Sequence, residues 1–296
     1  MKESKAQAEL VSRRALLRTG SLVCLLPMLP AIGFADEPAA GQPASAGETP
    51  AAPSQLPLKS TGLEHLGTIV PDVVAAGKFY GRLFNPELYK EKDPPLRYYV
   101  TLGVGYLALG TRPNQARAFF DHFCALVKDY DAPAMAQQLK TEGLPAGRYG
   151  IIPDPDGIGL QLLGVPGGLA KSTEPAGRIV DGESLVRPER LTHVVLHVSD
   201  LDKSVAFYRR FLGPETRGKH ASGAVSFQVA ETRLILESAA SGESPRVDRV
   251  GIRVQAFDHR SVSRELVRLG AQVTTQSKGN LRFTDPFGLG MELESV

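Results

Sequence analysis

Residues 193–201 read HVVLHVSDL, and residues 65–72 carry a related string, HLGTIVPD. In both, a histidine opens an apolar run of the length and composition of a buried strand, and an amphipathic helical stretch follows. The two helical stretches share an aromatic pair, Phe79-Tyr80 and Phe207-Tyr208. The chain therefore looks like a tandem duplication in which the same strand and helix open each half.

Each half also closes on a matching turn and strand. The turns are Asp154–Gly157 and Asp285–Gly288, both of the form Asp-Pro-X-Gly. The apolar strands that follow carry one polar residue each, Gln161 and Glu292. A unit that begins on histidine and ends on glutamine or glutamate suggests two related domains with potential metal ligands at their strand ends.

Between these landmarks the hydrophobic periodicity alternates between strand and helix. It predicts an α+β fold of four βαβββ-like modules, paired so that each pair curls its mixed sheet around a shared cleft suited to a ligand. In the first half the predicted elements are strands 65–70, 98–102, 106–109, 119–127 and 159–163 and helices 73–84 and 132–142. In the second half they are strands 193–198, 224–229, 232–237, 249–254, 281–284 and 290–294 and helices 201–212 and 259–269.

The start of the chain predicts export. Arg13-Arg14 precede an apolar stretch over 21–34, which is short for a membrane span and is broken by Pro27 and Pro30. This resembles a twin-arginine signal peptide, so we expect a periplasmic or otherwise exported protein without stable membrane insertion after signal removal. The predicted organisation is export signal 1–35, disordered tether 36–59, first domain 60–166, linker 167–188 and second domain 189–296.

Composition narrows the class of partner. Residues 1–35 hold five basic and two acidic residues, so 29 basic and 30 acidic residues remain in the rest of the chain. A chain so nearly neutral gives no basis for a nucleic-acid partner or an anionic-membrane partner. Of the two cysteines, Cys24 leaves with the signal and Cys124 lies in an apolar run, where it is expected to be a core residue without a disulfide.

The ordered strings His193–Leu201 with Ala206–Tyr208, and the two Asp-Pro-X-Gly turns, resemble the vicinal oxygen chelate superfamily, which includes glyoxalase I, fosfomycin and bleomycin resistance proteins and extradiol dioxygenases. The resemblance extends over 60–296 and implies two tandem domains of this type. It also implies a divalent metal in the cleft, held by residues from the first and last strands of paired modules. It does not name the reaction.

Matched to the family positions, the first domain offers His65, His122 and Gln161 as metal ligands. The fourth family position falls near 108–110, where the sequence has no ligand. Two imidazoles and an amide oxygen leave coordination positions open for water and substrate, and they do not distinguish iron, manganese, zinc or copper. Gln161 is the sharper signal, because an unpartnered buried amide costs about 1–3 kcal/mol. The alternative is that both histidines are structural.

The second domain offers His193, Glu237 and Glu292 as a possible second site. Arg249 stands where the first domain has His122, and a guanidinium does not bind metal. A pair between Arg249 and Glu292 is therefore favoured over a second metal. Tyr149 and His197 are further candidates for cleft residues.

Two functions remain open. The favoured one is an exported metal-dependent enzyme that acts on a small oxygen-rich or aromatic molecule by chelating its vicinal oxygens, with dioxygenase-like or lyase/isomerase-like chemistry. The extradiol branch normally has a tyrosine ten residues before its last ligand, where this chain has Ile151, and glyoxalase chemistry normally uses a metal-bound carboxylate, which Gln161 lacks. The alternative is a non-catalytic protein that sequesters a small molecule, as bleomycin resistance proteins do. No catalytic residue is assigned.

Overall fold

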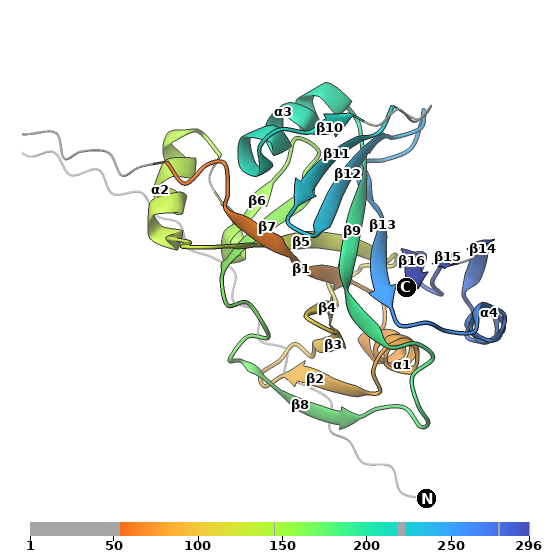
Figure 1. The fold of residues 1–296 in the computed structure, drawn as a ribbon. Helices are drawn as coiled ribbons and strands as arrows, with labels where there is room; N and C mark the ends of the chain where they lie inside the picture. The colour runs from red at the N-terminus through yellow and green to blue at the C-terminus, as the bar shows by residue number, and fades with distance from the viewer. Residues whose placement is uncertain (1–53, 145, 218–222, 278, 296) are drawn as a thin grey trace, which may run out of the picture. The chain divides into compact units, whose positions relative to one another are not determined.

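The computed structural model describes residues 54–144, 146–217, 223–277 and 279–295 (Figure 1). The predicted export signal and most of the predicted tether lie outside these residues. Residues 51–296 form one compact unit that contains two eight-stranded mixed sheets. Within the described residues, no helix has both the length and the apolar character needed to cross a membrane.

The first sheet has the strand order β6-β7-β5-β1-β4-β3-β2-β8. In this sheet β1 runs parallel to β4 on one side and antiparallel to β5 on the other. Its elements in chain order are β1 (Ser60–Ile69), α1 (Val73–Leu83), β2 (Glu87–Glu91), β3 (Tyr98–Leu102), β4 (Gly105–Gly110), β5 (Phe119–Val127), α2 (Ala132–Thr141), a short 3-10 turn η1 (Arg148–Gly150), β6 (Ile151–Pro153), β7 (Gly159–Gly164) and β8 (Thr173–Arg178).

The second sheet repeats this plan with the order β10-β11-β12-β9-β13-β16-β15-β14. Here β9 lies between β12 and β13, as β1 lies between β4 and β5. Its elements are β9 (Pro188–Val198), α3 (Leu201–Leu212), β10 (Thr216–Arg217), β11 (Val225–Val229), β12 (Thr232–Ser238), β13 (Arg246–Val254), α4 (His259–Arg268), β14 (Gln272–Ser277), β15 (Asn280–Thr284) and β16 (Gly290–Ser295).

Aspartates set the start of every α-helix. The side chain of Asp72 accepts hydrogen bonds from the backbone amides of Val74 and Ala75, and Asp200 accepts one from that of Lys203. Asp131 and Asp258 cap α2 and α4 in the same way. A carboxylate at this position satisfies amides that have no partner within the helix, and it faces the positive end of the helix dipole.

The α+β fold of two paired-module domains is confirmed, with one difference in the first sheet. The predicted linker 167–188 contains β8, which pairs with β2 at the edge of the sheet (Figure 1). In the first sheet one module contributes three strands (β6, β7 and β5), and the other contributes five (β1, β4, β3, β2 and β8). In the second sheet each module contributes four strands. The β8 sequence, TEPAGR, contains proline and glycine and predicts a loop, but an edge strand needs hydrogen bonds on one side only.

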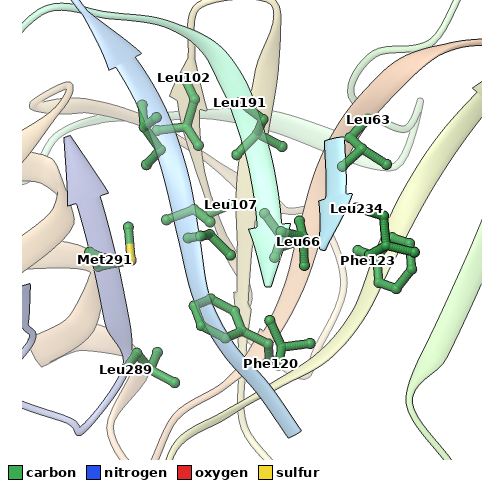
Figure 2. Packing of buried hydrophobic residues seen from close by; sticks show 14 of the residues in the cluster. Leu63, Leu66, Leu102, Leu107, Phe120, Phe123, Leu191, Leu234, Leu289 and Met291 are labelled. Atoms are coloured by element: carbon green, nitrogen blue, oxygen red, sulfur yellow. The ribbon is translucent and has the colours of Figure 1, made fainter. Parts of the chain in front are cut away.

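Both sheets contribute to one continuous cluster of buried apolar side chains. Figure 2 shows part of this cluster, with Leu66 and Phe123 from the first sheet and Leu191 and Leu234 from the second among the labelled residues. Burial of this kind contributes about 1.5–3 kcal/mol for each large aliphatic or aromatic side chain.

Two equivalent hydrogen bonds join the halves at the edges of this core. The hydroxyl of Tyr80 on α1 donates to Asp285 at 2.6 Å, and that of Tyr208 on α3 donates to Asp154 at 2.9 Å. Both tyrosines are fully buried. The aromatic pair and the Asp-Pro-X-Gly turn, which identified the duplication in the sequence, thus contact each other across the two halves.

Candidate metal centre

The three ligands predicted for the first domain lie together. His65 on β1, His122 on β5 and Gln161 on β7 line one cavity of about 590 Å³. Their strands are adjacent, because β5 pairs with both β1 and β7. The Nε2 atom of His65 lies 3.0 Å from Oε1 of Gln161, and the imidazole rings of His65 and His122 meet edge to face with centroids 5.5 Å apart.

A carboxylate contacts the Nδ1 atom of each imidazole. Nδ1 of His65 lies 3.0 Å from Oε2 of Glu64, and Nδ1 of His122 lies 3.0 Å from Oδ2 of Asp121. Neighbouring residues of a regular strand point to opposite faces, so these contacts need an irregularity. The β1–β5 register shifts at both places, and each bulge lets a histidine and the preceding acid meet. Carboxylate–histidine pairs of this kind orient imidazoles toward a metal.

The hydrogen bonds of His65 and Gln161 indicate which of their side-chain atoms have a lone pair available to a metal. Burial is the largest effect on His65 and lowers its pKa, so the ring is neutral at pH 7. With Nδ1–H donated to Glu64, the lone pair on Nε2 faces the cavity. The Gln161 amide donates from Nε2 to the carbonyl of Tyr149 at 2.9 Å, which turns Oε1 toward His65. In this tautomer two acceptor atoms lie 3.0 Å apart, and a cation that both atoms coordinate relieves the repulsion. The donor set fits a divalent metal.

Cys124 also lies near this centre. Its Sγ is within 4.8 Å of ligand atoms of Glu64 and His65. The side chain is fully buried, and burial raises the pKa of its thiol well above the ordinary value. A protonated thiol is a poor ligand. Cys124 is thus a core residue, as its apolar surroundings in the sequence predict.

Aromatic and charged residues form the remaining walls. Tyr106 stacks on His65 with ring centroids 4.5 Å apart and planes 12° from parallel. Tyr149 borders the cavity, with a positive φ of 61° and 57% of its surface exposed. The other charged and polar lining residues are Glu91, Arg97, Tyr99, Lys171 and Ser172.

The connection between the domains covers one side of the cavity. Residues 166–172 all line it. The backbone amide of Gly168 donates to Oε1 of Glu64, so this one carboxylate holds both the covering segment and His65. A side chain at Gly167 would collide with Glu64, since a Cβ there would lie 1.8 Å from Oε1. Glu64 and Asp121 were not predicted from the sequence, although an acid immediately before each candidate histidine is a signal that could have identified them.

The equivalent place in the second domain holds a network of ion pairs. Arg249 donates to Glu237 at 3.0 Å and to Asp248 at 2.9 Å, and its Nε is 3.8 Å from Glu292. The expected pair between Arg249 and Glu292 is therefore the weakest of these three contacts. The main partner of Glu292 is Arg282, at 2.8 Å, because the two residues lie opposite each other on β15 and β16.

The histidines of this domain join the same network. Nε2 of His193 is 3.7 Å from Glu292, and its Nδ1 is 3.4 Å from Glu294, a carboxylate that the sequence analysis missed. His197 lies 3.4 Å from Glu237. His193 and Glu292 are thus brought together, whereas Glu237 is joined to Arg249 and His197.

Comparisons with known proteins agree with this architecture. Residues 193–293 match the family model of the glyoxalase-like domain. No curated protein sequence matches the chain significantly. Among solved structures, a catechol 2,3-dioxygenase is similar with a TM-score of 0.58 and 18% identity, over 80% of this chain and 88% of the other.

Two further similar structures are a glyoxalase and a 2,3-dioxygenase. The Mn(II)-bound glyoxalase from Novosphingobium aromaticivorans has a TM-score of 0.56 and 16% identity, over 80% of this chain and 83% of the other. The 2,3-dioxygenase LapB from Pseudomonas sp. KL28 has a TM-score of 0.53 and 15% identity, over 81% and 93%. At such identities the similarity establishes the fold. The glyoxalase-like match covers the second domain, residues 193–293, and the solved structures share the fold of both domains.

Proposed function

We propose that the first domain binds a divalent metal through His65, His122 and Gln161 and that the protein is a metal-dependent enzyme. Its substrate is a small oxygen-rich or aromatic molecule that chelates the metal through two adjacent oxygens. The observation that carries the proposal is the pair of facing acceptors, His65 Nε2 and Gln161 Oε1, in a cavity lined by His122. The proposal includes export to the periplasm, which rests on the sequence of residues 1–35 alone.

The donor types support a transition metal. Imidazole nitrogen suits iron, manganese, zinc and copper, and three protein ligands leave positions open for substrate. The structural relatives support the same class of chemistry, since their names include catechol dioxygenases and a Mn(II)-bound glyoxalase.

The metal, when bound, would act as a Lewis acid on the chelated oxygens. The residues of the chain provide orientation and a restricted cavity. Glu64 and Asp121 fix the two imidazoles, and Tyr106 packs flat against His65. The donor set has no carboxylate, so a metal-bound base is absent from it, and proton transfer would fall to the substrate or to another wall of the cavity.

That same feature favours a second candidate, a protein that binds and sequesters a small molecule without turnover. Three neutral ligands hold a metal and a chelating ligand as readily as they support catalysis. The two candidates share the metal site and differ in turnover.

The test is metal analysis of the purified folded protein, followed by titration with Mn²⁺ and Co²⁺. We expect one ion per chain, with affinity at least a hundredfold lower in His65→Ala and His122→Ala. The matched control is His193→Ala, which removes the buried imidazole at the same strand position of the second domain and is expected to keep the ion. Retention of the ion by both first-domain variants would refute the site.

Turnover is tested on the metal-loaded protein. Catechols, hydroxyquinols and α-hydroxycarbonyl compounds are screened for oxygen uptake and for product formation. Consumption of any of these that is lost in His122→Ala supports the enzyme. Tight ligand binding without consumption supports the sequestering protein.

A further inference from the structure

The wall of the first-domain cavity that faces the candidate ligands carries a basic side chain, Arg97. It lies against Gly110 at the end of β4, where a Cβ would be 3.6 Å from the arginine Nε and 3.7 Å from its Cγ. The β1 register places Gly110 two residues beyond Ala108, and Ala108 shares its row with His122 through Gly67. Two residues of a strand span about 6.5 Å. Arg97 therefore lies on the same face of the sheet as His122, farther along the strand direction.

Among the residues that the structure describes, Arg97 has no carboxylate within ion-pairing distance. Its polar neighbour is the hydroxyl of Tyr99, which donates to Glu91. Burial and Glu91 raise the pKa of Tyr99 to about 12 although Arg97 opposes them, so the phenol is neutral at pH 7. The partly buried guanidinium borders the cavity and has a neutral phenol beside it instead of a carboxylate.

The register counterpart in the second domain shows how such a charge is normally neutralised. Glu237 occupies on β12 the position that Gly110 occupies on β4. Its carboxylate pairs with Arg249 at 3.0 Å. The first domain has glycine in place of this carboxylate, and Arg97 covers the space that is left.

The charges around the cavity leave an excess of positive charge once a metal is bound. The three candidate ligands are neutral. The carboxylates nearby are Glu64, Asp121 and Glu91, whereas the basic side chains are Arg97, Lys171 and Arg112, and a divalent ion adds to them. Of these, Arg112 already pairs with Asp121. An anionic ligand is what compensates the remainder.

We propose that Arg97 binds an anionic group of the substrate, so that the substrate class is a carboxylate-bearing molecule with two vicinal oxygens at its other end. The proposal rests on the proposed function for the chelating end and on Arg97 alone for the anionic end. Arg97 is a specificity-determining residue in this scheme. A guanidinium presents a planar fork that matches a carboxylate in two parallel hydrogen bonds.

The test uses the full chain loaded with Co²⁺ and two probes of similar size, 3,4-dihydroxybenzoate and 4-methylcatechol. Calorimetric titration gives the dissociation constant of each. We expect wild-type protein to bind 3,4-dihydroxybenzoate at least tenfold more tightly, with a preference that falls as salt is added. Arg97→Gln is expected to reduce the ratio to about one while leaving 4-methylcatechol binding unchanged. Arg97→Lys keeps the charge but lacks the planar fork, so it should retain only part of the preference.

The matched control is Arg178→Gln, which removes an exposed arginine from β8 of the same domain and should leave the ratio unchanged. Equal affinity of wild-type protein for the two probes would overturn the proposal, as would equal weakening of both probes in Arg97→Gln. Titration of metal-free protein with benzoate separates the two proposals. If the chain binds no metal, the proposed function fails, and benzoate binding that depends on Arg97 still decides the anionic site.

Discussion

The two domains have the same backbone plan, but the residues at equivalent positions of their sites differ in charge. Where the first has His122, the second has Arg249, and where the first has Gln161, the second has Glu292. The second domain satisfies its charges internally, through Arg249 with Glu237 and Arg282 with Glu292. The first domain places two imidazoles and a side-chain amide around one cavity.

This difference shows how a duplicated scaffold can divide its tasks. In the second domain Glu237 and Glu292 already have cationic partners. A buried polar atom without a hydrogen-bond partner destabilises the fold unless a ligand binds to it. The bulges that bring two consecutive residues to the site are present in both domains, so the two sites differ in their side chains rather than in their backbone.

The largest effect is expected when one residue of the first domain is replaced by its counterpart in the second. His122→Arg gives the first domain the residue of the second without the glutamate that pairs with it, because Gly110 occupies that position. We expect metal affinity to fall by at least a thousandfold, since one ligand is lost and a cation is brought beside the other two. Titration with Mn²⁺ measures this, and circular dichroism checks the fold.

The reverse replacement, in the second domain, tests how much the ion pairs of Arg249 stabilise the fold. Arg249→His leaves Glu237, Asp248 and Glu292 without their shared cation, so we expect the free energy of unfolding to fall by about 3 kcal/mol at pH 7. The variant then has two histidines and a glutamate where the first domain has two histidines and a glutamine. Added Co²⁺ should recover part of the lost stability in chemical denaturation, and wild-type protein should show no second binding event.

The sequence predicted the duplication, most strands and all four α-helices because hydrophobic periodicity and repeated strings are local properties. It also predicted which residues meet at His65, because the family resemblance supplied the strand order that periodicity does not contain. It did not predict β8, whose partner β2 is distant in the chain, or the position of Arg97 against Gly110, which follows from the pairing of β3 with β4.

The ion network of the second domain was only partly predictable. The exchange of histidine for arginine at 249 is visible in the sequence, and it correctly indicates ion pairing. The choice of partners depends on register, because Arg282 lies opposite Glu292 and takes the place expected for Arg249. A one-residue difference in register would have changed both pairs.

The charge of Glu292 should make the second domain sensitive to acid. Burial raises its pKa, but the contact with His193, the hydrogen bond from Asn280 and the charge of Arg282 outweigh burial and bring it to about 2. A pKa below the unfolded value of about 4.5 stabilises the folded state above that pH, and this contribution is lost as the pH falls from 4.5 toward 2. We expect about 2 kcal/mol of pH-dependent stability in this window.

Urea denaturation between pH 6 and pH 3 measures this contribution. Glu292→Gln should be less stable at pH 6 and should lose less stability on acidification than wild-type protein. Glu294→Gln, two residues along the same strand, is the control and should keep the wild-type slope. An unchanged slope in Glu292→Gln would show that other groups cause the acid sensitivity.

The smallest effect tests what the two halves share. Tyr80→Phe and Tyr208→Phe each remove one of the equivalent hydrogen bonds between the halves and leave a buried carboxylate without its phenol partner. We expect each to cost about 1–2 kcal/mol, because Asp285 and Asp154 keep two backbone donors each. If the halves are equivalent as structural units, the two losses agree within error and add in the double variant, since the pairs are separate. A loss confined to one variant would show that the halves depend on each other unequally, and it would restrict the duplication to the backbone.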